Sequence, residues 1–226
     1  VRATVMGLGL HGGGAATVRF LAEAGAVVTA TDLRSRKELE PTLHKLADLD
    51  VRYVLGRHDQ SDFDRADLVV KNPAVRRNVP ILDRVRFVTT DIALFLAVRR
   101  HNIQLQGGAS GGRTDRTRAP LIGVTGTKGK STTASAIAHI LTARYPNTRL
   151  GGNITVSPLT FLDALTTDDP VVLELSSFQL GDLAWCRTVN DAHPTPAGIA
   201  GHPLFNTLRN PVAAADVAVV TNLLWD

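Results

Sequence analysis

The chain has 226 residues, of which 44% are apolar and 5% aromatic, and its formal net charge is +4. This length is comfortable for two domains, and no run approaches the roughly 18 consecutive apolar residues of a membrane-spanning helix. Scattered basic residues with few aromatic side chains argue against a nucleic-acid platform, and the single Cys186 excludes an internal disulfide framework. We therefore expect a cytoplasmic monomer with no nucleic-acid or membrane partner.

Strands alternate with helices along the first hundred residues. Apolar runs bounded by Gly or Asp predict the strands, and amphipathic runs predict the helices. This alternation is typical of an α/β fold with a parallel sheet and right-handed crossovers. The expected strands are residues 3–6, 26–31, 51–55, 68–70 and 87–88, and the expected helices are residues 15–24, 39–49 and 91–100.

A glycine-rich loop follows the first expected strand. Gly7, Gly9 and Gly12 match the pattern G-x-G-x-x-G, and Asp32 ends the second strand 20 residues beyond Gly12. In a strand–loop–helix unit this pattern places a diphosphate at the helix N-terminus and the acidic residue beside a ribose hydroxyl. The pattern indicates a dinucleotide or a nucleotide sugar, while the alternative is a unit whose glycines only allow tight packing.

A polar, Gly-rich stretch divides the chain. Residues 105–120 predict a flexible linker or loop, so we expect a Rossmann-like domain over residues 1–104 and part of an ATP-binding α/β domain over residues 121–226. Within the second part, residues 187–211 hold four prolines with several Gly and His and predict an irregular loop. The other expected elements there are strands over residues 121–124, 171–175 and 217–222 and a helix over residues 132–141.

The loop after residue 124 has the composition of a phosphate-binding loop. It reads Thr125-Gly126-Thr127-Lys128-Gly129-Lys130-Ser131, between an expected strand and an expected helix. Its glycines allow backbone N–H groups to surround a polyphosphate, Lys130 can neutralise the outer phosphates, and Ser131 can bind Mg²⁺. Val124 stands where the strict pattern has Gly, so the match is to a shortened variant. The alternative is a Gly-rich turn before a surface helix.

Glu174 interrupts an otherwise apolar strand. A carboxylate is costly to bury unless it is paired or metal-bound. One interpretation is a glutamate at a strand end that faces solvent. With a phosphate loop on another strand, a ligand to Mg²⁺ is the better interpretation.

The order of these motifs resembles the Mur ligase family of peptidoglycan synthesis, and residues 173–180 resemble the branch that adds D-glutamate. Folylpolyglutamate synthases share the phosphate loop but lack the N-terminal nucleotide-sugar domain, so residues 7–12 argue against them. The chain departs from the family in having His11 where a small hydroxyl residue is usual and Ala74 where Gly is usual. The segments that carry the resemblance are residues 7–12, 72–75, 91–95, 125–132, 151–154 and 174–180.

The resemblance implies an ATP-dependent amide ligase that uses ATP and Mg²⁺. ATP would convert the carboxylate of UDP-N-acetylmuramoyl-L-alanine into an acyl phosphate, which the amine of D-glutamate then attacks. The implied catalytic residues are Lys130 and Glu174, and the implied metal ligands are Ser131 and Glu174. The implied ATP-binding residues are Gly126, Thr127, Lys128, Gly129, Lys130, Ser131 and Thr132. The implied UDP-substrate residues are Leu10, His11, Asp32, Arg34, Asn72, Pro73, Asn153, Ser176 and Gln179.

The family pattern continues beyond Asp226 with a metal-binding His and an amino-acid-binding domain for D-glutamate. We therefore expect this chain to be the N-terminal part of such a ligase and to be inactive in ligation by itself. One alternative is a UDP-sugar- or nucleotide-binding module without ligase activity. Another is an NAD-dependent oxidoreductase, which rests on the first glycine loop and Asp32 alone and leaves the phosphate loop and Glu174 unexplained.

Overall fold

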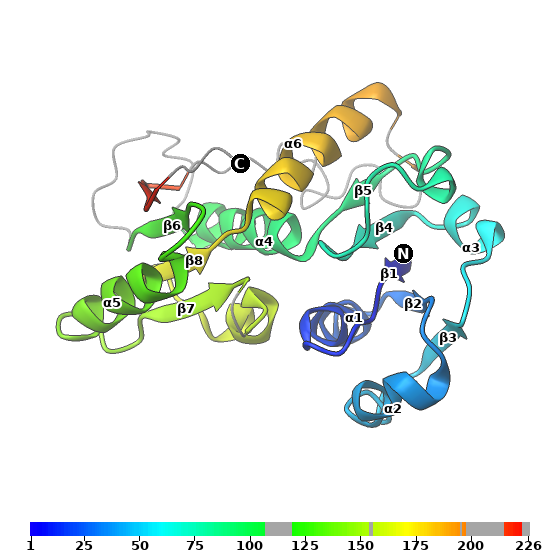
Figure 1. Ribbon diagram of the computed structural model, residues 1–226, viewed down its shortest axis with the longest axis horizontal. Helices are drawn as coiled ribbons and strands as arrows, with labels where there is room; N and C mark the ends of the chain where they lie inside the picture. Colours follow the sequence, from blue (N-terminus) through cyan, green and yellow to red (C-terminus); the bar gives the residue numbers. More distant parts are fainter. Residues whose placement is uncertain (107–118, 154–155, 195, 198–214, 223–226) are drawn as a thin grey trace.

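The computed structural model describes residues 1–106, 119–153, 156–194, 196–197 and 215–222. It contains two parallel sheets flanked by helices (Figure 1), which confirms the α/β fold class. Residues 107–118 of the expected linker lie outside the described residues, as does most of the proline-rich segment from residue 198. No helix in the described part of the chain is long and apolar enough to cross a membrane.

The first sheet has the strand order β3-β2-β1-β4-β5. Its pairs are parallel, so the carboxyl ends of the strands meet at one edge, where ligands bind in open α/β sheets. The strands are β1 (Arg2–Met6), β2 (Val27–Asp32), β3 (Val51–Leu55), β4 (Leu68–Lys71) and β5 (Val88–Thr89). The helices of this part are α1 (Gly13–Glu23), α2 (Arg36–His44), α3 (Gln60–Asp64) and α4 (Asp91–Gln106), with a 3₁₀ turn η1 (Pro80–Leu82).

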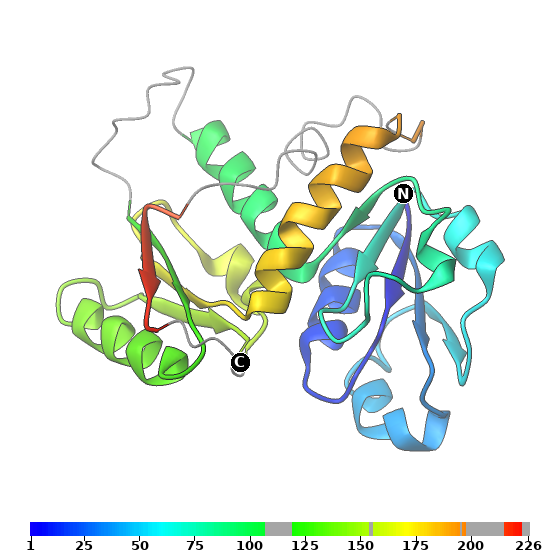
Figure 2. The same cartoon turned by 45° about the horizontal axis from the view of Figure 1, so that its top comes forward.

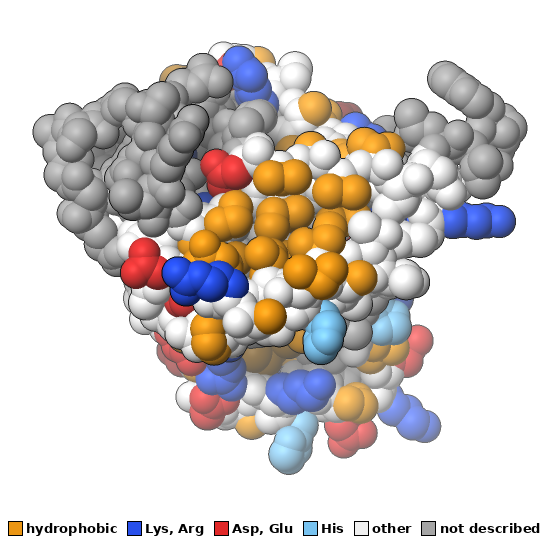
Figure 3. Space-filling view, turned by 90° about the vertical axis from the view of Figure 1, so that its left-hand side faces the viewer, with side chains coloured by type: hydrophobic (Ala, Val, Ile, Leu, Met, Phe, Trp, Pro, Cys, Tyr) orange, Lys and Arg blue, Asp and Glu red, His pale blue; other side chains and the backbone are white. Residues whose placement is uncertain are grey.

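The second sheet has the strand order β7-β8-β6-β9, again with parallel pairs. Its strands are β6 (Leu121–Thr125), β7 (Arg149–Gly152), β8 (Val171–Glu174) and β9 (Val217–Val220). Its helices are α5 (Lys130–Thr142) and α6 (Ser177–Ala192), with a 3₁₀ segment η2 (Pro158–Ala164). On the side that carries α5 and β9, apolar side chains gather at the surface (Figure 3), and Ile140 of α5 is 70% exposed.

The expected helix over residues 39–49 differs from the observed helix α2 at both ends. Helix α2 begins at Arg36 because the Ser35 side chain accepts a hydrogen bond from the Glu38 N–H and forms a capping box, so it starts before the expected residue 39. The chain from Lys45 to Leu49 then forms tight turns, with Leu46 N–H donating to Leu43 O, so the helix does not reach residue 49.

The prediction of an irregular loop from residue 187 is wrong for residues 187–192, because α6 continues to Ala192. One side of this helix is apolar, and Trp185, Cys186 and Val189 pack against the first sheet. Burial of that face stabilises the helix up to the residues just before Pro194, where the prolines begin.

Helix α6 therefore connects the two sheets. It follows β8 of the second sheet and lies along the junction with the first (Figure 2). The buried apolar cluster beneath it includes Cys186 of α6 together with Met6 and Val69 of the first sheet. A second contact between the two parts is made by Phe95 of α4, whose ring meets that of Phe161 edge-on at a centroid distance of 5.9 Å.

Candidate functional site

A cavity of about 1010 Å³ lies at the carboxyl edge of the first sheet and is closed on one side by residues of the second part. The loops after β1, β2, β3 and β4 form its larger wall. Gly152, Asn153, Ser157 and Gln179 form the opposing wall. This volume lies at the upper end of the range of about 300–1,000 Å³ that is typical of pockets for small organic ligands.

The glycine-rich loop brings backbone N–H groups to the cavity. Gly7 has a φ of +92°, and a Cβ there would lie 2.8 Å from the Cβ of Asn72. Gly12 begins α1 with a φ of +89° and has open space around it. The closest approach is at Gly14, where a Cβ would lie 2.2 Å from Leu8 O, and the sequence motif did not single out this residue. The first turn of α1 can thus present unpaired N–H groups to a phosphate.

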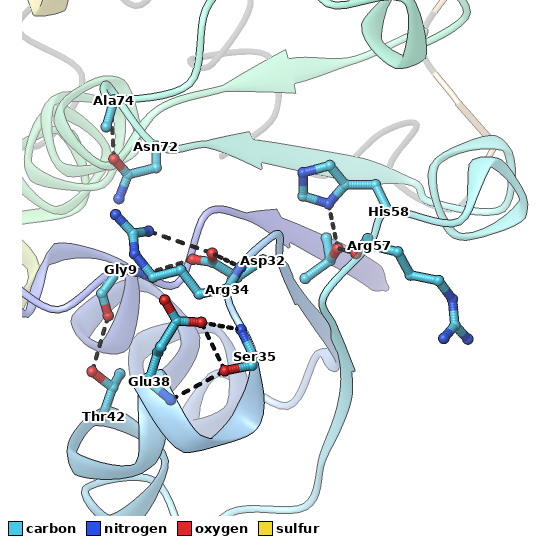
Figure 4. A network of polar contacts seen from close by, with 11 residues as sticks. Gly9, Asp32, Arg34, Ser35, Glu38, Thr42, Arg57, His58, Asn72 and Ala74 are labelled. Carbon is cyan, nitrogen blue, oxygen red and sulfur yellow. Dashed lines mark hydrogen bonds and ion pairs between the residues drawn. The ribbon is translucent and has the colours of Figure 1, made fainter.

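Asp32 is 2% exposed, and both of its carboxylate oxygens bind backbone N–H groups (Figure 4). Oδ2 accepts from Gly9 N–H and Oδ1 accepts from Arg34 N–H, each at 2.9 Å. The Thr42 hydroxyl donates to Gly9 O at 2.9 Å and so holds the peptide group that follows Gly9. Asp32 therefore joins the loops after β1 and β2, in addition to lining the cavity.

Eight of the nine residues expected at the UDP substrate line this one cavity. Asn72 accepts from Ala74 N–H at 3.0 Å and so shapes the turn after β4. Ser176 is the exception: its hydroxyl accepts from Gln179 N–H at 3.2 Å and caps α6, while Gln179 Oε1 accepts from Ser176 N–H at 2.9 Å. This capping box leaves the Gln179 amide nitrogen as the group that can face a ligand. The eight lining residues are Leu10, His11, Asp32, Arg34, Asn72, Pro73, Asn153 and Gln179.

Other polar side chains line the cavity but were not predicted as site residues. Asp91, the first residue of α4, lies next to the start of α1, and burial raises its pKa to about 6. Its signal in the sequence was the segment of residues 91–95 that carries the resemblance. Arg57 and His58 follow β3. Nothing in the local sequence marked them, because their loop matches no motif.

The phosphate loop lies at the carboxyl end of β6, outside this cavity. Lys130 Nζ donates to Gly126 O at 2.9 Å and to Thr127 O at 3.4 Å, so the ammonium is folded back over the loop. Gly129 begins α5 with a φ of +80°, and the exposed Ser131 and Thr132 occupy the first turn of that helix. The start of α5 is thus a helix N-terminus of the kind that can bind an anion, and its role as an ATP site stays a prediction.

Two residues after β9 hold the phosphate loop and were missed by the sequence analysis. Thr221 donates its hydroxyl to Lys128 O, and a Cβ on Gly126 would lie 2.2 Å from its Oγ1. Asn222 Oδ1 accepts from Lys128 N–H at 2.8 Å, and Asn222 O accepts from Thr127 N–H at 3.0 Å. A polar pair directly after an apolar strand was the available signal.

Glu174 ends β8, which pairs with β6 and β7. It is 2% exposed, and its Oε1 accepts from Asn153 Nδ2 at 3.4 Å. Its Oε2 is buried without a hydrogen-bond partner among the described residues, which is costly for a carboxylate and suits a cation. The described residues contain no group of three or more His, Cys, Asp or Glu that could hold a metal. A divalent cation here would therefore also need ligands such as the Ser131 hydroxyl, water or phosphate oxygens.

Two family models match the chain. Residues 1–93 match the Mur ligase MurD-like N-terminal domain, and residues 124–197 match the Mur ligase middle domain. The UDP-N-acetylmuramoylalanine--D-glutamate ligase of Borreliella afzelii is 48% identical over 181 residues, which cover 79% of this chain and 36% of that protein. The ligase of the same name from Treponema pallidum is 45% identical over 186 residues, which cover 80% of this chain and 32% of that protein. The chain thus spans about a third of the length of these relatives.

One similar solved structure is the UDP-N-acetylmuramate:L-alanyl-gamma-D-glutamyl-meso-diaminopimelate ligase from Neisseria meningitides. The alignment covers 98% of this chain and 77% of the chain in that structure. Its sequence identity to this chain is 16%, and the TM-score of 0.44 is too low for a detailed structural comparison.

Proposed function

Since this chain belongs to the Mur ligase family and carries its N-terminal and middle domains, we propose that it forms the UDP-substrate and ATP sites of an ATP-dependent amide ligase. The substrates that we propose are UDP-N-acetylmuramoyl-L-alanine and D-glutamate, joined in peptidoglycan precursor synthesis. The relatives with this activity in their names support the proposal.

One contact carries the assignment. Asn153 lines the large cavity and also donates a hydrogen bond to Glu174, at the end of the strand beside β6. An acyl arm attached to a nucleotide at the glycine-rich loop would therefore lead past Asn153 toward the phosphate loop. In this proposal a substrate carboxylate would lie near the γ-phosphate of ATP, as phosphoryl transfer requires.

In the proposed reaction, the carboxylate attacks the γ-phosphorus of ATP, ADP leaves, and an acyl phosphate forms. The amine of D-glutamate attacks the acyl carbon, loses a proton, and inorganic phosphate leaves as the amide forms. Lys130 would replace its hydrogen bonds to the loop carbonyls by hydrogen bonds to oxygens of the β- and γ-phosphates. Ser131 and Glu174 would hold Mg²⁺, which when bound neutralises negative charge on the phosphates. The Mg²⁺ proposal rests on the unpartnered buried oxygen of Glu174.

The two alternatives explain less of the molecule. A nucleotide-sugar module needs the cavity but neither the phosphate loop nor the buried Glu174. An NAD-dependent oxidoreductase needs the first glycine loop and Asp32, but gives no role to the second sheet's contribution to the cavity.

Isothermal calorimetry with the chain tests the substrate class. We expect UDP-N-acetylmuramoyl-L-alanine to bind and NAD to bind more weakly or not at all. Asp32→Ala should weaken the UDP ligand by on the order of 1–3 kcal/mol, because the Gly9 and Arg34 N–H groups lose their acceptor. The exposed Asp48→Ala is the control. Tighter binding of NAD than of the UDP ligand would contradict the proposal.

The ATP site is tested by Lys130→Ala. We expect loss of ATP–Mg²⁺ binding with an unchanged circular dichroism spectrum, because within the described part of the chain this ammonium donates to the loop carbonyls of Gly126 and Thr127 and not to the core. Lys37→Ala, on exposed α2, should bind ATP normally. Unchanged ATP affinity in Lys130→Ala would show that the loop is structural.

We assign no D-glutamate site to the described residues. We therefore expect the 226-residue chain alone to bind both nucleotides without forming the amide bond, because positioning two reactants supplies roughly 7–11 kcal/mol of barrier lowering. Incorporation of labelled D-glutamate at the rate of an intact ligase would contradict this expectation.

A further inference from the structure

His58 is held rigidly at one end of the cavity. It lies in the loop after β3, is half-buried, and lines the cavity together with Asp32. Its Nδ1 lies 2.5 Å from the hydroxyl of Thr31 on β2. The buried ring of Phe63 meets the imidazole edge-on, with a centroid distance of 6.0 Å and an interplanar angle of 81°. Two contacts from different elements thus fix the position and plane of this ring.

The two contacts of the Thr31 hydroxyl favour one tautomer of His58. Thr31 Oγ1 donates to Arg57 O at 3.1 Å. A carbonyl oxygen can only accept, so both contacts are hydrogen bonds at once only when the Thr31 hydroxyl donates to Arg57 O and its Oγ1 accepts from His58 Nδ1–H. In a neutral imidazole with hydrogen on Nδ1, the other nitrogen Nε2 is an acceptor. Burial lowers the pKa of His58, which favours this neutral form near pH 7.

The sheet order indicates which part of a nucleotide meets His58. Strands β1, β2 and β3 are successive neighbours in the sheet. A diphosphate belongs at the start of α1, after β1, and a ribose belongs near Asp32, at the end of β2. The base, next along the ligand, then lies toward the end of β3, where His58 stands.

We infer that His58 Nε2 accepts a hydrogen bond from N3–H of uracil and thereby selects uracil over cytosine. Cytosine carries a lone pair at N3 instead of a hydrogen, so two acceptors would face each other. This inference rests on the proposed function, because it assumes that the nucleotide end of a UDP-linked substrate lies in the cavity. It makes His58 a specificity-determining residue of that site.

Calorimetry of the 226-residue chain with UDP, CDP and N3-methyl-UDP tests the inference. We expect the wild-type chain to bind UDP at least about tenfold more tightly than CDP or N3-methyl-UDP. This ratio of dissociation constants corresponds to the loss of about one hydrogen bond. His58→Leu removes the acceptor and should bring the UDP-to-CDP affinity ratio close to one. Thr31→Val keeps the shape of Thr31 but removes the hydroxyl that accepts from His58 Nδ1–H. Both tautomers of His58 then become accessible, so the UDP-to-CDP affinity ratio should also fall. His44→Leu, the same substitution on the exposed end of α2, should leave the ratio at its wild-type value.

The outcomes separate the two proposals. If UDP binds and His58→Leu keeps the wild-type UDP-to-CDP ratio, the inference about His58 is overturned while the proposed function stands. If neither UDP nor UDP-N-acetylmuramoyl-L-alanine binds to the folded wild-type chain, both are overturned. A ratio that falls in His58→Leu and Thr31→Val but not in His44→Leu supports the inference, because a purely structural role would weaken both nucleotides equally.

Discussion

Single buried polar residues around the cavity serve the backbone as well as any ligand. Asp32 and Asn72 line the cavity, and their oxygens accept hydrogen bonds from the loops around them. Ser176 is occupied as a helix cap. A buried acceptor must find a donor, and the nearest donors are the N–H groups of tight turns. A binding role for Asp32 and Asn72 therefore depends on their remaining lone pairs or amide hydrogens.

Glu174→Gln tests the proposed cation site at the residue scale. Gln keeps the shape of Glu and removes the charge, so the Mg²⁺ concentration needed for ATP binding should rise by roughly tenfold. The fold should be unharmed, since an unpaired buried charge is removed. ATP titrations at a series of Mg²⁺ concentrations measure the effect, and the exposed Asp163→Asn is the control. The same Mg²⁺ requirement in both variants would exclude Glu174 as a ligand.

Asp91 should make stability depend on pH. Its pKa is raised by burial from 3.8 to about 6, so the folded chain binds more protons than the unfolded chain between these values. The contribution of Asp91 to the free energy of unfolding is therefore largest at low pH, and it is lost as the pH rises from about 4 to 6. Above pH 6, Asp91→Asn should be more stable than the wild type by up to about 3 kcal/mol.

Urea unfolding of both chains between pH 4 and 8 measures this difference. Burial also raises the pKa of Asp182, so a smaller slope of the same sign should remain in Asp91→Asn. Asp163→Asn should keep the full wild-type slope. Identical slopes in Asp91→Asn and the wild type would show that the carboxyl group of Asp91 titrates normally.

Among the elements, α6 determines how the two sheets are joined. Lys71 Nζ at the end of β4 donates to Asp182 Oδ2 of α6 at 2.8 Å, and both side chains are buried. The Asn190 side chain accepts from Val88 N–H and donates to Val88 O, each at 2.8 Å, and so completes the edge of β5. Gln179, one turn before Asp182, is thereby held at the cavity wall.

Lys71→Met should destabilise the chain by about 3 kcal/mol, because among the described residues it leaves the buried Asp182 with only the partly exposed Arg77, at 3.5 Å. Adding Asp182→Leu removes the unpaired charge and should restore most of that loss. Urea unfolding measures both variants. Arg19→Met, which breaks an exposed pair with Asp48, should cost less than about 1 kcal/mol. A double variant no more stable than Lys71→Met would contradict this account of α6.

For the molecule as a whole, the cavity belongs to both parts of the chain. A ligand that fills it contacts the loops of the first sheet and also Asn153 and Gln179. Binding to the folded state alone stabilises by about 2.7 kcal/mol at a ligand concentration of 100 Kd. Ligand binding should therefore stabilise both sheets, because the ligand contacts residues of each.

Hydrogen exchange followed by mass spectrometry measures that reach. UDP-N-acetylmuramoyl-L-alanine should slow exchange in peptides of residues 7–14 and of residues 176–182, whereas UDP alone should protect mainly the first set. Asn153→Ala should reduce the effect of the full ligand on the second set. Protection confined to residues 7–14 with the full ligand would show that the second wall makes no contact.

The sequence by itself determined most strands, both glycine loops and the position of Glu174. These features are local: continuous apolar runs, positive φ at Gly7 and Gly129, and a carboxylate at a strand end each leave a short-range pattern. Only the tertiary structure decided that Gln179 faces the same cavity as Asn72, that Thr221 holds the phosphate loop, and that α6 runs on to dock on the first sheet. These contacts join surfaces distant in the chain, and their geometry depends on how complete elements pack, which no short segment encodes.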